Sequence, residues 1–149
     1  MILNLLIHSM KILCKYNNPD NVPQNVPQFN FGLELEKEYL IMGMMLANKQ
    51  LWYMIDENGK PDFYPYQLFR VTDASMNPNW YFKLYDTDDK IFPFEKEFVW
   101  GYTELVFDES HYEQLVDREE DALRVYFRRK IELEGKVGKV PLVAQRQTP

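Results

Sequence analysis

Residues 38–73 read EYLIMGMMLANKQLWYMIDENGKPDFYPYQLFRVTD, and this stretch decides the fold. It opens with a continuous apolar run from Tyr39 to Leu46. Such a run predicts a β-strand covered on both faces, because a half-solvated strand would alternate apolar with polar residues. A buried helix is the competing interpretation, since leucine and methionine are good helix formers. Gly43 in the middle of the run and the short length of the run favour the strand.

The second half of this stretch predicts a β-hairpin. Leu51–Ile55 is aromatic and apolar, and we expect it to be the central strand. Asn58-Gly59 then marks a tight turn, because both residue types tolerate the positive φ angles that a short hairpin requires. Pro61 and Pro65 follow, and neither can donate a ladder hydrogen bond. The return limb is therefore expected to be an edge strand or an irregular extended segment.

The segment Phe63–Val71 contains an aromatic residue, a proline, a short turn and an aromatic-plus-valine strand, and it looks like the last part of an SH3-type barrel. The wider arrangement, from Lys37 to Val71, resembles small bacterial proteins with SH3-like barrels, some of which are regarded as immunity proteins that neutralise toxins. This similarity covers about residues 10–130. It implies an α+β fold built on a partly open SH3-like antiparallel β-barrel. The acidic segment of eukaryotic peptide-binding SH3 domains is absent, which argues against proline-peptide binding.

The flanking segments extend this domain. Dense apolar residues predict further strands at Met10–Tyr16 and Trp80–Tyr85, and the alternation in Phe29–Leu35 predicts either a short strand or an extended approach to the barrel. One long amphipathic C-terminal helix is expected over about residues 110–131, where apolar residues recur at helical spacing and Ser110 starts a capping box. The predicted organisation is an N-terminal extension (1–9), a single barrel-plus-helix domain (10–134) and a flexible tail (135–149).

The composition is that of a folded protein with an acidic surface. The 149 residues are 46% hydrophobic and 15% aromatic, which excludes a disordered chain. A formal charge of −6 makes nucleic acid a poor partner, because phosphate contacts need clustered lysine and arginine. A basic protein partner suits this charge better, although acidity that serves solubility alone explains it equally well. No apolar run reaches the roughly 18 residues that span a membrane, and one unpaired cysteine indicates a reducing, cytoplasmic location.

No set of catalytic or metal-binding residues stands out. The two histidines, His8 and His111, lie far apart, and Cys14 has no CxxC partner. We expect His111 to be a solvated surface residue and Cys14 to be a small buried hydrophobe. The acidic pair Asp56-Glu57 is interpreted as part of a turn. The sequence therefore predicts a protein that is not an enzyme and that holds no cofactor and no metal.

Two features indicate a surface for a protein partner. One is an acidic loop beside a tyrosine, which suits a basic partner, unless it is an ordinary solvated loop. The other is a set of aromatic residues that would line a groove, unless they only fill the core. The candidate partner-binding residues are Tyr64, Tyr66, Trp80, Tyr85, Asp86, Asp88 and Asp89.

The predicted function is that of a non-catalytic protein-binding module, an immunity protein that neutralises a cognate basic toxin by occluding its active surface. One alternative is a peptide-binding or regulatory adaptor that uses the barrel edge, which an exposed apolar groove beside Tyr64 and Pro65 would favour. The other is a small hydrolase or nucleotide-binding domain with an unrecognised carboxylate site. A deep pocket holding convergent carboxylates would favour that one.

Overall fold

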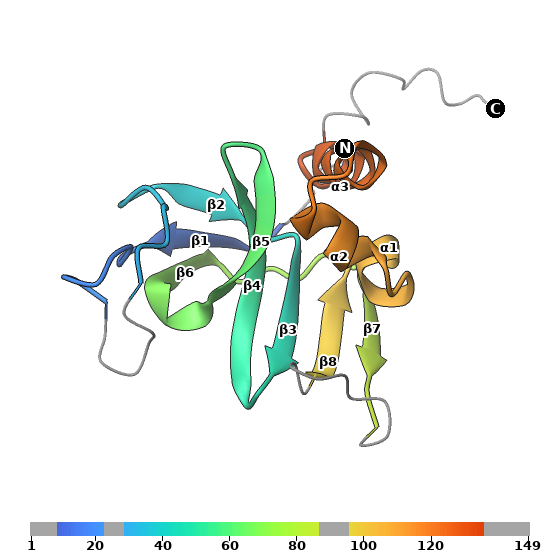
Figure 1. The fold of residues 1–149 in the computed structure, drawn as a ribbon, viewed down its shortest axis with the longest axis horizontal. Coiled ribbons are helices and arrows are strands. Elements are labelled where there is room, and N and C mark those ends of the chain that lie inside the picture. The colour runs from blue at the N-terminus through green and yellow to red at the C-terminus, as the bar shows by residue number, and fades with distance from the viewer. Residues whose placement is uncertain (1–8, 23–28, 87–95, 136–149) are drawn as a thin grey trace, which may run out of the picture.

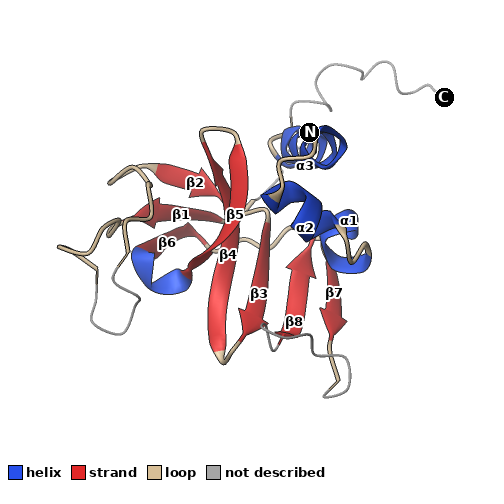
Figure 2. Cartoon of the chain, in the orientation of Figure 1, coloured by secondary structure: helices blue, strands red, loops and turns tan. Residues whose placement is uncertain are grey.

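The computed structural model describes residues 9–22, 29–86 and 96–135 (Figure 1). Within these ranges, eight strands form two antiparallel sheets, and three helices follow near one end of the molecule (Figure 2). The predicted antiparallel α+β fold is confirmed. The two sheets are not closed into a barrel, so the expected partly open SH3-like barrel is corrected to two separate sheets.

The smaller sheet joins the beginning of the domain to segments from residues 38–73. Its three strands lie in the order β2 (Glu38–Leu40), β1 (Lys11–Cys14) and β6 (Phe69–Asp73). Ile12 on β1 is fully buried and pairs with Tyr39 on one side and Val71 on the other. The predicted first strand is therefore confirmed.

The larger sheet has five strands, and two of its hairpins come from residues 38–73. The strand order is β5 (Lys60–Pro65), β4 (Gln50–Glu57), β3 (Gly43–Ala47), β8 (Lys96–Gly101) and β7 (Tyr81–Leu84). Asn58 (φ 54°) and Gly59 (φ 74°) form the predicted tight turn between β4 and β5. As predicted, β5 is an edge strand. The central strand, however, is β3 and not the predicted Leu51–Ile55 segment, which lies in β4.

The apolar run from Tyr39 to Leu46 is not one strand, as the sequence predicted, but two strands in different sheets. The Ile41 N–H donates to the Met10 carbonyl (3.0 Å), beside the smaller sheet. The next N–H, that of Met42, donates to the Met54 carbonyl in the larger sheet (2.8 Å). These two residues therefore transfer the chain from one sheet to the other.

The larger sheet is the middle layer of the molecule, because alternate side chains of its strands enter different cores. On β3 and β4, Met45 and Met54 pack with residues of all three helices in the first core. Their neighbours Met44, Tyr53 and Ile55 pack with residues of β1 and β2 in the second core. The order of layers is small sheet, large sheet, helices.

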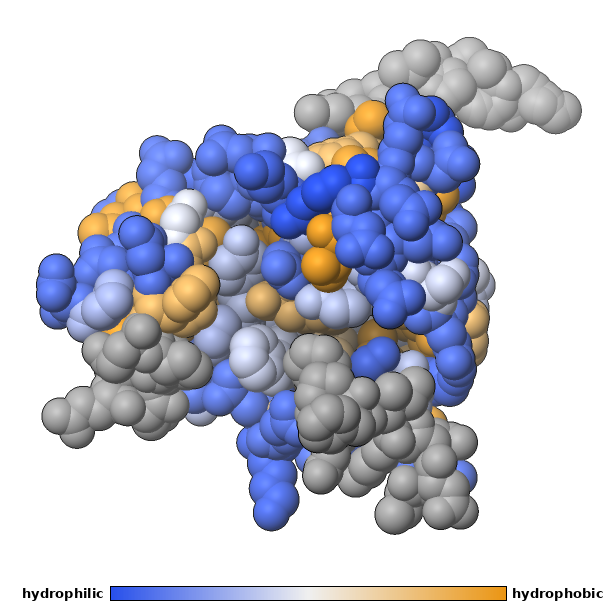
Figure 3. All heavy atoms as spheres, viewed as in Figure 1, coloured by the Kyte–Doolittle hydropathy of each residue, from blue (hydrophilic) through white to orange (hydrophobic). Residues whose placement is uncertain are grey.

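Two helices, α2 (His111–Val116) and α3 (Glu120–Leu133), replace the single helix expected over residues 110–131, and a third, α1 (Thr103–Phe107), precedes them. A short 3₁₀ turn, η1 (Tyr66–Leu68), precedes β6. On the face drawn in Figure 3, hydrophilic side chains predominate over the helices. The break between α2 and α3 lies at Arg118, whose φ is 60°. Its guanidinium donates to the carbonyls of Leu115 and Pro61 (both 2.9 Å), so one side chain both ends α2 and ties it to β5.

One further local prediction is wrong, and one that left two alternatives open is decided. Ser110 makes no side-chain bond to the helix that follows it, because its hydroxyl donates to Asp108 (2.8 Å), so the predicted capping box is absent. Phe29–Leu35 forms no strand. The Phe31 N–H donates instead to the Asn17 carbonyl (2.8 Å), which fixes this segment as an irregular connection.

Candidate functional site

The most exposed apolar surface in the described part of the chain lies on β7 and the adjacent helix α1 (Figure 1). We define the β7 edge as four residues that each expose about half or more of their surface. They are Tyr81 (49%), Phe82 (48%), Leu84 (67%) and Phe107 (52%). Exposed aromatic and aliphatic side chains gathered on one element are a mark of protein-interaction surfaces.

The alternation of β7 places these side chains on two faces of the sheet. Tyr81 points to the helix side, where its ring meets the ring of Phe107 edge-on at 5.5 Å. Phe82 points to the opposite side and contacts the rings of Trp100 (5.7 Å) and Phe98 (5.8 Å) on β8. The exposed rings are therefore supported by neighbouring rings, and little side-chain entropy remains to be lost when a partner binds.

Acidic residues surround the β7 edge. Residues 81–110 contain eight aspartates and glutamates but only three lysines. This segment therefore has a net charge of −5, and the whole chain has a net charge of −6. In the parts of this segment that the structure describes, the count is five acids to two lysines. One of these lysines, Lys83, is paired with Glu109 (3.4 Å). The potential around the edge is therefore negative.

The predicted contact loop begins where β7 ends. Tyr85 is partly buried against the first core, and the ammonium groups of Lys83 and Lys96 lie 4.9 and 5.5 Å from the centre of its ring. Asp86 is exposed beside it. Asp88 and Asp89 lie outside the described residues. The structure thus places Asp86 and the exposed rings of β7 at one end of the larger sheet.

The other predicted aromatic residues do not gather into one groove. Tyr64 and Trp80 are partly buried and pack against the second core, where Tyr64 meets the ring of Phe31 at 6.5 Å. Tyr66 is exposed (42%) on η1, at the opposite end of the larger sheet from β7. Pro65 beside Tyr64 is fully buried.

Sequence reasoning missed Tyr81, Phe82, Leu84 and Phe107. The strand over Trp80–Tyr85 was predicted, but only Trp80 and Tyr85 in it were named as contact candidates. Whether such a strand lies at the edge of a sheet depends on the strand order, which its own residues do not specify.

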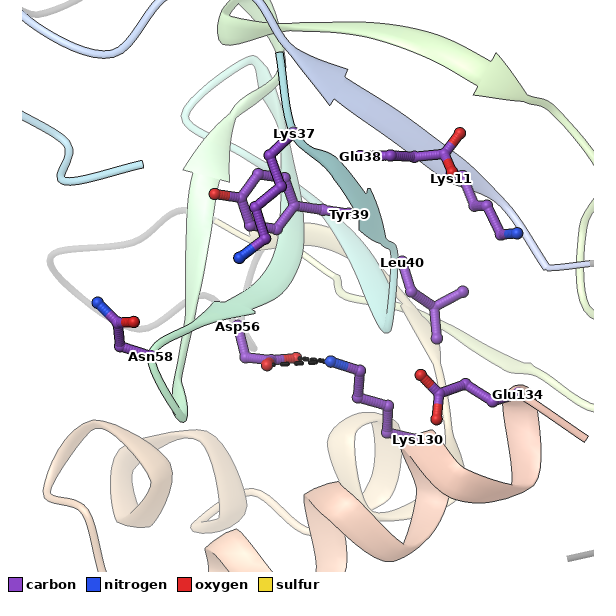
Figure 4. Close-up of a pocket in the computed structure, with 9 residues that line it drawn as sticks. All are labelled: Lys11, Lys37, Glu38, Tyr39, Leu40, Asp56, Asn58, Lys130 and Glu134. Carbon is purple, nitrogen blue, oxygen red and sulfur yellow. Dashed lines mark hydrogen bonds and ion pairs between the residues drawn. The ribbon is translucent and has the colours of Figure 1, made fainter. Parts of the chain in front are cut away.

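A polar cleft lies on the other side of the molecule, between the smaller sheet, the β4–β5 turn and the end of α3. It holds about 270 Å³. Figure 4 shows lysine side chains entering it from three elements, with Lys130 of α3 directed at Asp56 of β4. Its lining residues are Lys11, Lys37, Glu38, Tyr39, Leu40, Asp56, Asn58, Lys130 and Glu134.

The predicted turn pair, Asp56 and Glu57, forms the end of β4, and both acids have tyrosine and lysine partners; of the two, Asp56 lines the cleft. Asp56 accepts from the Tyr126 hydroxyl (2.8 Å) and from the Lys130 ammonium (2.9 Å). Glu57 accepts from the Tyr39 hydroxyl and the Lys37 ammonium. These bonds join the tip of one hairpin to α3 and to β2, so the pair connects all three layers.

We expect Tyr126→Phe to lower the free energy of unfolding by about 1–2 kcal/mol, because it removes a hydrogen bond to a charged, largely buried carboxylate. The side chain is fully buried, so the missing hydroxyl leaves Asp56 with one partner fewer and no water in its place. Urea denaturation measures the change. Tyr66→Phe removes the same group at an exposed position and should change stability by less than about 0.5 kcal/mol. Equal effects of the two variants would contradict this role for Asp56.

His111 is buried (2% exposed), and the expectation of a solvated surface residue is wrong. Its Nε2 lies 2.7 Å from the hydroxyl oxygen of Tyr102, inside the core formed by the helices. Burial lowers the pKa of His111 below its usual 6.5, although the nearby carboxylates of Asp108 and Glu104 oppose this shift. Burial likewise raises the pKa of Tyr102, so both groups are neutral in the folded protein.

We therefore expect acid to destabilise the protein through His111. The unfolded chain takes up a proton near pH 6.5, whereas the folded protein resists protonation until a lower pH. This contribution to stability is complete above about pH 7.5 and is lost as the pH falls through 6.5 toward the folded-state pKa. The melting temperature of the wild type should thus drop more between pH 7.5 and 5.5 than that of His111→Gln. His8→Gln is the control, and a pH dependence unchanged by His111→Gln would contradict the prediction.

The remaining chemical groups offer little reactivity. Cys14 is fully buried, as predicted, and burial raises the pKa of its thiol to about 11. In the described ranges, no three histidine, cysteine, aspartate or glutamate side chains are placed to hold a metal ion. No helix in these ranges has the length and apolar character needed to cross a membrane.

Comparisons of the chain with protein-family models, with curated proteins and with solved structures gave no match.

Proposed function

We propose that this protein is a non-catalytic binding protein, an immunity protein that neutralises a toxin by covering its active surface. The observation that carries the proposal is the β7 edge, where four large apolar side chains stand exposed beside an acidic loop. An exposed apolar surface rimmed by charges fits a protein partner better than a small molecule. The cleft is a weaker candidate, because Asp56 and Glu38 in its lining are already bonded within the fold, Asp56 to Tyr126 and Lys130 and Glu38 to Thr72.

The charge distribution supports a basic partner. Most of the net negative charge lies between residues 81 and 110, around the proposed contact surface. Such a field accelerates association with a positively charged protein, and the apolar contacts then slow dissociation. Toxins that attack nucleic acids or nucleotides are often basic, so an acidic surface suits their neutralisation.

The contact residues that we propose combine both kinds of side chain. Tyr81, Phe82 and Leu84 supply apolar contact, and the loop from Tyr85 to Asp89 supplies the acidic rim. Because rim charges mainly set the association rate and buried anchors set the affinity, the two groups should be separable by experiment. A regulatory adaptor would use the same surface, and only suppression of a toxic activity distinguishes it from an immunity protein.

The test uses the protein encoded beside this chain, because immunity proteins are usually encoded next to their toxins. We expect the two proteins to form a complex and the toxic activity to be lost in it. Replacing Asp86, Asp88 and Asp89 with lysine should lower the association rate roughly tenfold at low salt. That difference should shrink as the ionic strength rises. Absence of a complex would refute the immunity function, and an unchanged rate at every salt concentration would place the contact surface elsewhere.

A further inference from the structure

The two end strands of the larger sheet differ in how their outer edges are protected. A helix packs beside each of them, α2 beside β5 (Tyr112 to Phe63, 5.1 Å) and α1 beside β7 (Phe107 to Tyr81, 5.5 Å), so the difference lies in the backbone: on β5, Pro61 and Pro65 provide no N–H. On β7 there is no proline, and β8 is its one strand partner among the described residues. Unprotected edge strands are templates for pairing with another chain.

The register of β7 identifies the backbone groups that point outward. The Tyr85 N–H donates to the Glu97 carbonyl (3.0 Å), just beyond the end of the strand. In an antiparallel pair, bonded and non-bonded residue pairs alternate. Lys83 and Tyr81 therefore bond to β8, like Tyr85, through their pairs with Val99 and Gly101. The N–H and C=O groups of Phe82 and Leu84 point away from β8.

The side chains of the same two residues are also exposed. Phe82 exposes 48% of its surface and Leu84 exposes 67%, the largest fraction among the large apolar residues in the described ranges. Two residues thus present both outward backbone groups and apolar side chains. An added strand is recognised by this combination, because the backbone supplies the hydrogen bonds and alternate side chains supply the contacts.

The charge of this edge selects among possible added strands. Five acids and two lysines flank it in the described part of residues 81–110. Two of these acids are paired, Glu109 with Lys83 (3.4 Å) and Glu104 with Arg129 (2.9 Å), and the remaining balance of three acids to one lysine is still negative. A second copy of this chain would bring an equally acidic edge against it, which is unfavourable. An extended segment rich in arginine or lysine complements it.

We propose that the partner docks by strand addition: an extended basic segment pairs with the outer edge of β7 through the N–H and C=O groups of Phe82 and Leu84. This inference rests on the proposed function and specifies its binding mode. Alternate apolar side chains of the added strand contact Phe82 and Leu84, and its basic side chains lie near Asp86, just beyond the end of β7.

The test uses a defined probe, a capped heptapeptide of alternating arginine and valine, and follows the backbone amide signals of the full chain by NMR. We expect saturable binding with Kd below about 1 mM. The largest shifts should be at Phe82 and Leu84, and an otherwise identical peptide with glutamate for arginine should bind at least about tenfold more weakly. In the free, monomeric protein these two amides should exchange rapidly with solvent.

Two variants at one position separate the contribution of the backbone N–H to peptide binding from that of the side chain. Leu84→Pro removes an outward N–H without breaking a bond to β8, whereas Leu84→Thr keeps the N–H and shortens the side chain. We expect Leu84→Pro to weaken peptide binding about fivefold to tenfold relative to Leu84→Thr. Both variants should still give the amide spectrum of a folded protein.

Several results would overturn strand addition. These are absence of peptide binding, equal binding by Leu84→Pro and Leu84→Thr, no preference for the basic peptide, and slow exchange at Phe82 and Leu84 in the free protein. A dimer joined through β7 would also overturn it, since a second copy would then be the occupant. None of these results would refute the proposed function, which fails only if the neighbouring gene's product does not bind.

Discussion

Replacing Phe82 and Leu84 together with serine is expected to weaken binding to the protein encoded beside this chain by about 100-fold or more. Both side chains are half exposed or more on β7, and central apolar anchors of this kind each contribute roughly 2 kcal/mol to an interface. The loss should lie mainly in a faster dissociation rate, because the acidic loop that steers association is untouched. Surface plasmon resonance measures both rates.

A control variant removes two exposed apolar side chains elsewhere. Val116 on α2 and Ile131 on α3 are exposed to 42% and 41%, and their replacement with serine changes the helices but leaves β7 intact. This double variant should bind within about twofold of the wild type. If the two double variants lose affinity equally, the β7 edge has no special role.

Gly43→Ala is expected to cause the largest loss of stability, about 3 kcal/mol, by overpacking the centre of the larger sheet. A Cβ at this position would lie 2.3 Å from Leu105 Cδ2 and 2.9 Å from the Trp100 carbonyl oxygen. The leucine can rotate, but the carbonyl belongs to the adjacent strand β8 and cannot move without distorting the sheet. For a chain of this length, the melting temperature should fall by roughly 5–10 °C.

Gly32→Asn is the control for this prediction. Gly32 has a positive φ (70°), which asparagine tolerates, and no heavy atom lies within 4 Å of a Cβ placed there. Its replacement should change stability by less than about 1 kcal/mol. A stability loss at Gly43 no larger than that at Gly32 would show that the sheet accommodates the added methyl group.

The parts of the fold that the sequence predicted well are those set by local chemistry. The turn at Asn58-Gly59 forms because both residues adopt positive φ, and β5 is an edge strand because Pro61 and Pro65 cannot donate ladder bonds. The burial of Cys14 was likewise predictable from its residue type.

The incorrect predictions concern features that depend on distant partners. The apolar pattern across Ile41 and Met42 is the same whether these residues lie in one sheet or two, and only their acceptors, Met10 and Met54, separate the sheets. Helical periodicity continues past Arg118, but bonds to Pro61, far away in the sequence, break the helix there. His111 is buried against Tyr102, which is not on the same helix. The helical spacing of residues around His111 therefore could not predict this contact.

Only the acidic part of the candidate site could be predicted from the sequence, because the exposure of its apolar part depends on distant segments. The acidic loop near Asp86 is visible in the composition, and its position next to a strand follows from the order of residues. Exposure of Phe82 and Leu84 depends on β7 being the last strand of the sheet. Strand order is a property of the whole fold, so the sequence did not identify these two residues as exposed.

Amide hydrogen exchange in the complex with the neighbouring gene's product tests the central claim most directly, namely that the β7 edge is the partner-binding surface. We expect the amides of Phe82 and Leu84 to exchange quickly in the free protein and at least about tenfold more slowly in the complex. The amides of Tyr66 and Ile131, on other surfaces, should be unaffected. Unchanged exchange along β7, with new protection at η1 or α3, would contradict the claim.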